Sequence, residues 1–323
     1  MFLPEYTITT RILNNIATLE YAKAVIDNTV ILPAWENQVR NEAKTNTLHA
    51  LLKKSAINID KTTVKQHVEG LHEKTLPEIK SMESTLFAAQ EAAKTDEVSE
   101  EVLKKLQKVV GESGSYRRKR APGKTSPEEI LAQVVQLFDW IHTRDALEMH
   151  PAISAAVIYA ELERIQPFQN FSAATSFLIA QVHMQKQGYM LKDFIAPENY
   201  ISGTKGMYEQ LINSLDEETP DFTAWIKYFT EGMAYEASTV KDQVKLLAKD
   251  TKVATTTGRS DLNDRQEKIV VYLKDYGTLR NKDFSRVFPS ISEDTVLRQL
   301  KSLMEKGIVV KKGSTKSSRY ELA

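Results

Sequence analysis

The sequence predicts a mainly α-helical protein with a small amount of β-structure close to its end. Long stretches rich in Ala, Leu, Glu and Lys carry apolar residues three and four positions apart, which is the period of an amphipathic helix. Glycine is scarce, with 12 among 323 residues, and strand-like runs occur only after Gly307. A chain of this length is too long for one compact core and predicts two or three domains.

The composition excludes several classes of protein. The chain has no Cys, so it holds neither a disulfide framework nor a thiolate metal site, and its six His residues lack the spacing of a metal-binding motif. We therefore expect no metal site. The first ten residues lack a basic start and an apolar run, and no uncharged apolar stretch reaches about 18 residues. These features predict a cytoplasmic protein with no membrane segment.

Charge is balanced overall but unevenly distributed. Lys and Arg together number 43, as do Asp and Glu. From Gly258 to the end there are 14 basic and 9 acidic side chains, so the tail is about +5 and the remainder about −5. A basic tail on a neutral chain suggests a separate part with its own partner.

Helices are predicted in order along the first two thirds. Residues 5 to about 110 have the helical period throughout, as in Leu103, Leu106 and Val110. Gly111 to Ser115 interrupts it, and residues 116–123 (YRRKRAPG) form a loop or hairpin. Ser126 to Glu129 has the features of a helix start: a Ser cap, Pro in the first turn, and acids at the positive end. Further helices are predicted at about 151–165, 172–188, 197–214 and 220–247.

The tail has a different character. After a linker at 251–261, a helix opens near Leu262, a short helix follows between Thr278 and Val287, and a third begins at Ser292. Two strand-like segments, 307–310 and 319–322, flank the polar residues 311–316 and predict a hairpin.

The middle of the chain resembles the Fic family, whose active members transfer AMP from ATP onto a hydroxyl group of a target protein. His150 to Ile165 looks like the helix before the family motif, and Phe177 to Tyr189 looks like the helix after it. The resemblance spans roughly residues 111–247. It implies a Fic-type helical bundle, with residues 1–110 as an N-terminal helical region and 111–250 as the Fic-like domain.

The motif itself, His-Pro-Phe-x-Asp/Glu-Gly-Asn-Gly-Arg-x-x-Arg, is degenerate in this chain. Pro167 and Phe168 match it. The other positions have changed: Gln166 replaces the catalytic His, Asn170 the acid, Phe171, Ser172 and Ala173 the Gly-Asn-Gly run, and Ala174 and Phe177 the two Arg.

These replacements predict loss of AMP transfer. An amide such as Gln166 cannot act as a general base, whose contribution is about 10² to 10⁴-fold. Neutral Asn170 holds magnesium less well than a carboxylate, and triphosphate charge is left without its two Arg partners. We therefore expect a regulatory or binding protein that needs no cofactor.

Two alternatives remain open at this stage. The first is an active protein adenylyltransferase that uses ATP with magnesium and altered residues. The second is weak anion binding by a vestigial loop at residues 171–174, where the helix dipole and backbone N–H groups persist. A plain structural interpretation makes Asn170 or Ser172 the cap of the following helix.

The resemblance also implies two accessory features. Residues 42–50 are the best match to the family's inhibitory helix, with His49 or Ala50 where its Glu would stand. The basic run that includes Tyr116, Arg117 and Arg118 matches the flap, which aligns a target protein in relatives. A solvated charged loop and a polyanion contact are the alternatives for this run. A homodimer is a family-level expectation.

Residues 262–323 resemble a winged helix-turn-helix domain. Its third helix presents Arg298 and Lys301, and the hairpin provides further cations for phosphate. The acids Glu293 and Asp294 at the start of that helix weigh against base contact, so DNA binding and protein docking both stay open. The hairpin cations are Lys311, Lys312, Lys316 and Arg319.

Overall fold

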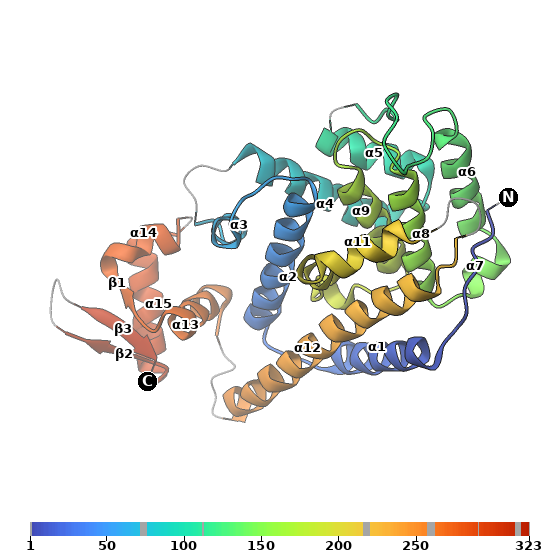
Figure 1. Ribbon diagram of the computed structural model, residues 1–323. Helices are drawn as coiled ribbons and strands as arrows, with labels where there is room; N and C mark the ends of the chain where they lie inside the picture. The colour runs from blue at the N-terminus through green and yellow to red at the C-terminus, as the bar shows by residue number, and fades with distance from the viewer. Residues whose placement is uncertain are drawn as a thin grey trace. The chain divides into compact units, whose positions relative to one another are not determined.

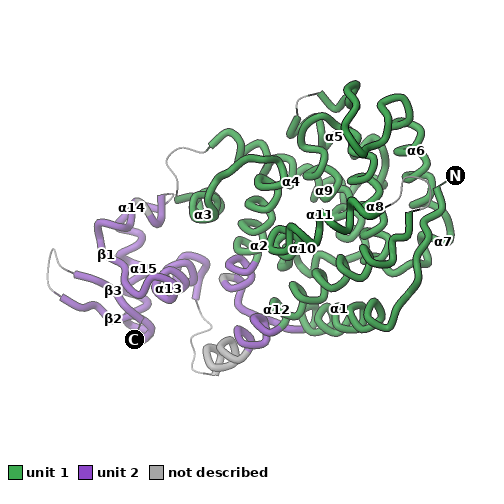
Figure 2. The backbone as a smooth tube through the Cα atoms, viewed as in Figure 1, with its two compact units in different colours: residues 1–28, 40–241 green, residues 29–39, 242–323 purple. Residues whose placement is uncertain are grey.

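The computed structural model describes residues 2–71, 76–111, 113–215, 220–256, 262–289, 291–313 and 318–322. The chain forms two compact units (Figure 2). Unit 1 comprises residues 1–28 and 40–241, and unit 2 comprises residues 29–39 and 242–323. Unit 1 therefore contains most of the predicted N-terminal helical region (1–110) and of the predicted Fic-like domain (111–250), except for residues 29–39 and 242–250.

The regular secondary structure of unit 1 is helical in the residues described, apart from a single β-bridge between Glu5 and Asp221. Helices α2 and α12 also run into unit 2. The helices are α1 (Thr10–Asn28), α2 (Pro33–Lys54), α3 (Lys61–Val68), α4 (Pro77–Thr95), α5 (Glu100–Gly111), α6 (Ile130–Ile141), α7 (Arg144–Glu148), α8 (Pro151–Ile165), α9 (Ser172–Lys186), η1 (Leu191–Asp193), α10 (Pro197–Gly203), α11 (Lys205–Asn213) and α12 (Thr223–Thr256).

Helices α8 and α9 form the centre of unit 1 and lie side by side (Figure 1). Almost every residue of both helices is buried: apolar and small residues lie on all sides, and charged residues such as Glu161, Glu163 and Arg164 of α8 are buried with them. α4 and α5 pack against α9, and α6 packs against α8. On α12, the Trp225 indole N–H donates to the carbonyl of Ala156 at 2.7 Å, which fixes α12 on α8. No helix among the residues described is both long and apolar enough to cross a bilayer.

Unit 2 is built on three helices and one small sheet. The elements are α13 (Asp264–Tyr276), β1 (Leu279–Arg280), η2 (Asn281–Asp283), α14 (Phe284–Val287), α15 (Glu293–Glu305), β2 (Val309–Lys312) and β3 (Arg319–Leu322). The strands are antiparallel in the order β1-β3-β2. Leu273, Phe284, Leu300 and Tyr320 belong to its buried core. Asn263 starts α13 with a capping box, in which it and Gln266 satisfy each other's free N–H groups.

Most predicted helices are confirmed. The predicted helix 197–214 is interrupted at Thr204, where α10 ends and α11 begins, and three boundaries differ. α6 begins at Ile130 instead of Ser126, because the Ser126 hydroxyl donates to the Glu129 carboxylate at 2.8 Å and the chain makes a turn there. α12 continues through Thr256, so the predicted linker starts later, and residues 257–261 lie outside those described. The short helix predicted from Thr278 begins with strand β1, which pairs with β3.

Candidate functional site: the loop between α8 and α9

Two left-handed residues shape the loop that joins the central helices. Gln166 ends α8 with φ 47° and ψ 66°, and Phe171 precedes α9 with φ 58° and ψ 12°. Neither is glycine, so each conformation costs about 1 kcal/mol or more that neighbouring contacts must offset. The N–H of Gln166 still donates to the carbonyl of Leu162 at 2.8 Å, which closes the last turn of α8.

Hydrogen bonds from within and beside the loop stabilise its conformation. The buried Ser172 hydroxyl accepts from the N–H of Phe168 at 3.3 Å. Asn170 is exposed, and its backbone carbonyl accepts from the Gln107 side-chain amide at 3.0 Å. The prediction that Asn170 or Ser172 caps α9 is wrong, because the N-cap position belongs to Phe171, whose side chain cannot accept a hydrogen bond.

The Arg117 side chain donates hydrogen bonds to the backbone at the start of this loop. This side chain is buried, and its Nε donates to the carbonyl of Gln166 at 2.7 Å. The two terminal nitrogens donate to the carbonyls of Ile165, Lys119 and Thr125. Its backbone N–H donates to the carbonyl of Pro167 at 2.9 Å. The guanidinium therefore satisfies carbonyls at the C-terminus of α8, where positive charge is favoured.

The other predicted flap residues lie on either side of Arg117. The Tyr116 ring packs on Phe168, with centroids 5.5 Å apart, and its hydroxyl donates to Glu100 at 2.7 Å. Burial, followed by the Glu100 hydrogen bond, raises the pKa of Tyr116 well above its usual value. Arg118 is exposed. Only Arg118 of these three is directed to solvent, beside an open depression lined by Ser115, Tyr116, Arg117, Arg118, Pro127 and Glu128.

Two further cations near the loop, Lys124 and Arg164, also form hydrogen bonds. The Lys124 ammonium donates to the carbonyl of Glu163 at 3.0 Å. Arg164 forms two hydrogen bonds to Glu161, at 2.6 and 2.9 Å, and both side chains are buried. Their charges are thus directed into the helical packing instead of toward a ligand on the loop.

The predicted anion loop offers no charge of its own. Residues 166–177 include no titratable side chain. Ser172 and Ala174 are buried, whereas Phe171 and Ala173 are half-buried at the start of α9. Phe177, the residue predicted to replace the second motif Arg, is fully buried, with its ring centroid 5.3 Å from that of Tyr159.

A polar cluster inside unit 1 was not predicted from the sequence. The Lys54 ammonium donates to the Tyr159 hydroxyl at 2.6 Å and lies 4.1 Å from the Tyr208 ring centroid. The Tyr208 hydroxyl donates to Glu163, and burial lowers the pKa of Lys54. Glu163 was a visible signal, since it is one of three charged residues, with Glu161 and Arg164, near the end of a largely apolar helix, but its partners come from α2 and α11.

Glu198 lies near Lys54 and is fully buried at the start of α10. Its Oε2 accepts from the Thr47 hydroxyl at 3.5 Å, and its Oε1 has no hydrogen-bond partner. Burial is the main reason that its pKa is raised to about 8, although Lys54 opposes the shift. This carboxyl is therefore neutral at pH 7.

The segment matched to an inhibitory helix lies within α2. His49 is half-buried and Ala50 is buried. Burial, then the positive charges of Lys53 and Lys61, lowers the pKa of His49. Within the described part of the chain, no hydrogen bond or ion pair connects His49 to the loop.

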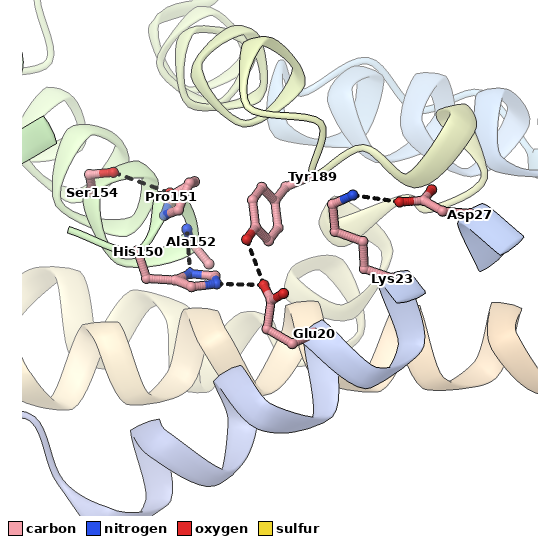
Figure 3. A network of polar contacts seen from close by, with 8 residues as sticks. All are labelled: Glu20, Lys23, Asp27, His150, Pro151, Ala152, Ser154 and Tyr189. Carbon is pink, nitrogen blue, oxygen red and sulfur yellow. Dashed lines mark hydrogen bonds and ion pairs between the residues drawn. The ribbon is translucent and has the colours of Figure 1, made fainter. Parts of the chain in front are cut away.

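A second polar network lies at the opposite end of α8 (Figure 3). His150 caps α8, since its Nδ1 accepts from the N–H of Ala152 at 3.1 Å. Its Nε2 lies 2.9 Å from Glu20 Oε1, which also accepts from the Tyr189 hydroxyl at 2.5 Å. These contacts tie α1 to the start of α8 and to the segment after α9, so the network is structural.

The predicted cations of unit 2 occupy two surfaces. Arg298 and Lys301 are exposed on one side of α15, together with Asp294 and Glu305. Lys311, Lys312 and Arg319 are exposed on the hairpin, and Lys316 lies outside the described residues. The sheet also aligns Arg280 with Arg319, and Arg319 with Lys312. Arg280 was missed because its position depends on strand β1.

Comparisons with known proteins identify the fold. No family model matches the sequence, and no curated protein does. A crystal structure of a Fic family protein from Desulfovibrio desulfuricans G20 is similar over 100% of this chain and 98% of its own, at 18% identity and a TM-score of 0.65. A Fic domain containing signaling protein from Bacteroides thetaiotaomicron is similar over 75% of this chain and 98% of its own, at 15% identity and a TM-score of 0.55. Fic-1 from C. elegans is similar over 74% of each chain, at 14% identity and a TM-score of 0.56. The chain therefore has a Fic-like fold.

Proposed function

We propose that this protein with a Fic-like fold does not transfer AMP, and that it acts as a regulatory protein which binds DNA through unit 2. One observation carries the first part of the proposal. The loop between α8 and α9 contains no titratable side chain, and the cation directly behind it, Arg117, already donates to four backbone carbonyls.

Nucleotide transfer needs groups that this loop lacks. Phosphoryl and nucleotidyl groups pass through a highly charged transition state, whose stabilisation is usually the largest catalytic contribution. Recruiting Arg117 would leave the carbonyls of Ile165 and Gln166 without their donor. Gln166 cannot take a proton from an attacking hydroxyl, and Asn170 offers magnesium no charge.

Two measurements on the full chain test this part. The first incubates the protein with magnesium and ATP labelled on the α-phosphate, both alone and with a cell extract. The second titrates ATP and magnesium calorimetrically, which requires no knowledge of a target. We expect no labelled protein and no binding heat, with Gln166→Ala identical to the wild type. Labelling that stops in Gln166→Ala would establish the alternative, an adenylyltransferase with substitute residues.

The second part of the proposal concerns unit 2. Three helices followed by a hairpin are the arrangement expected of a winged helix-turn-helix module, and cations are exposed on both its hairpin and α15. The net positive charge of the tail favours a polyanionic partner such as DNA over a protein surface that carries no net negative charge.

A salt series separates DNA binding from protein docking. We expect the full chain to bind mixed-sequence duplex DNA at low salt, with an affinity that falls steeply as salt rises, because each phosphate contact releases counterions. Absence of binding at low ionic strength would refute the DNA part and leave the proposal for the α8–α9 loop unaffected.

A further inference from the structure

The outer face of the small sheet in unit 2 carries a row of three cations. Val309 and Tyr320 are buried, so their strand neighbours point to the opposite, outer face. On that face Arg319 lies directly opposite both Arg280 of β1 and Lys312 of β2. Adjacent strands are about 4.8 Å apart, so the three charges span about 10 Å in a line.

Such a row has an electrostatic cost. Like charges placed directly opposite each other on neighbouring strands are destabilising. One carboxylate offsets this cost: Glu321 contacts the Lys312 ammonium at 2.6 Å and Arg319 Nε at 2.7 Å. Arg280 has no ion pair among the residues described.

The two cations are more exposed to solvent than the carboxylate that pairs with them. The side chains of Lys312 and Arg319 are 57% and 49% exposed, whereas that of Glu321 is 19% exposed. The cations therefore project into solvent from a carboxylate that lies closer to the sheet. A phosphate could reach both cations from the solvent side and would compete with Glu321 for them.

The exposed side of α15 makes a contrasting surface. Its outward charges are mixed: two cations, Arg298 and Lys301, lie between two acids, Asp294 and Glu305. They lie on one side of the helix because positions 294, 298, 301 and 305 are three or four residues apart. Glu293 is also exposed in the first turn, so α15 exposes three acidic and two basic side chains and attracts a phosphate backbone less than the sheet does.

We propose that the outer face of the sheet is the main phosphate-binding surface of unit 2 for duplex DNA, and that Glu321 limits affinity by competing with phosphate for Lys312 and Arg319. This inference rests on the proposed DNA-binding function. It adds the surface that makes the contact and the residue that sets its strength.

The decisive variant removes the competing charge without removing a cation. Glu321→Gln keeps the side-chain size and frees Lys312 and Arg319. We expect it to bind duplex DNA about 2- to 10-fold more tightly at low salt, as for the loss of two competing surface ion pairs. The slope of log affinity against log salt should steepen by about one to two, since up to two more phosphates are neutralised.

Glu305→Gln is the matched control, because it makes the same change in net charge in the same unit but on α15. Arg280→Ala is the converse variant, expected to weaken binding and to reduce the salt slope by about one. All four full-length proteins are compared by fluorescence anisotropy with a duplex of about 30 base pairs and mixed sequence. Thermal unfolding verifies that each variant is folded.

The outcomes separate the inference from the function on which it rests. Tighter binding by Glu321→Gln alone, with weaker binding by Arg280→Ala, supports the sheet. Equal tightening by both charge variants shows a net-charge effect, and tightening by Glu305→Gln alone shows contact through α15. Either result overturns the inference while DNA binding stands. No binding by any protein at low salt overturns both.

Discussion

Arg117 shows how one side chain can order a segment that has no regular structure. It connects the chain before α6 to the loop after α8 through carbonyl acceptors on both sides. A guanidinium suits this position because its donors are fixed in a plane and point in several directions, whereas an ammonium offers a single compact charge. The conformation of both segments therefore depends on this residue.

Substitution of Arg117 tests that dependence. Arg117→Ala should lower the free energy of unfolding by about 3 kcal/mol, because it leaves several enclosed carbonyls without a donor. Arg118→Ala is the control next to it in the chain, and since Arg118 is exposed the change should stay within about 0.5 kcal/mol. Urea unfolding of both variants makes the comparison, and equal effects would contradict the inward role of Arg117.

Glu198 makes stability depend on pH. Its pKa is raised from 4.5 to about 8 in the folded protein, chiefly by burial. Between these two values the unfolded chain has released the proton while the folded protein keeps it, so the contribution of Glu198 to stability falls as pH rises. Below pH 4.5 both states are protonated and the penalty disappears.

Glu198→Gln should remove this contribution, because Gln has a similar shape and does not ionise. We expect the variant to gain about 1–3 kcal/mol of stability relative to the wild type on going from pH 5 to pH 8. Denaturant unfolding at several pH values measures this difference. Parallel pH profiles for the two proteins would show that Glu198 titrates normally.

At the scale of elements, α8 and α9 place two residues of the predicted motif in different surroundings. Phe177 belongs to the core between the two helices, where its ring contacts Tyr159. Gln166, by contrast, is half-buried at the helix end. The two positions should therefore differ in how well they tolerate substitution.

Phe177→Arg should therefore destabilise the protein by about 3–5 kcal/mol, since it removes a buried ring and places an unpaired charge in the core. Gln166→His should cost under about 1 kcal/mol, because the new ring can extend toward solvent. Thermal melts followed by circular dichroism compare the two. Similar melting temperatures for both variants would show that α9 can rearrange around position 177.

At the scale of the whole molecule, the two units do not follow the order of the chain. Residues 29–39, from the early part of the sequence, belong with the C-terminal unit. Within that unit, Trp35 is 8% exposed, and the Lys274 ammonium lies 5.0 Å from its ring centroid. Gln38 also contacts Asp275 at 3.4 Å.

Removal of residues 262–323 should therefore expose Trp35. The other two Trp residues, Trp140 and Trp225, are buried in unit 1. We expect a red-shifted Trp emission for the truncated chain. The shift should be absent when Trp35→Phe proteins of both lengths are compared. An unchanged emission maximum after truncation would show that residues outside 262–323 bury Trp35.

The sequence predicted structure best where the pattern of apolar residues and helix-starting residues determines a helix. α8 has the predicted limits because it is rich in apolar and small residues and Pro151 can start a helix but not continue one. The inward orientation of Arg117 was not predictable, because a run of five residues, YRRKR, does not reveal which cation faces the carbonyls of α8. Glu198 lies at the start of the predicted helix 197–214, and nothing in its own segment indicates that the carboxyl is buried and accepts a hydrogen bond from Thr47 of α2. Strand β1 has two residues, too few for a detectable alternation.

The anchoring of residues 115–125 through Arg117 has a consequence for how this protein can diversify. Side chains at positions 118–124 are not the only groups that fix the backbone there, because Arg117 donates to the carbonyls of Lys119 and Thr125. Exchanges at the exposed positions there are therefore expected to leave the hydrogen bonds between Arg117 and the end of α8 in place.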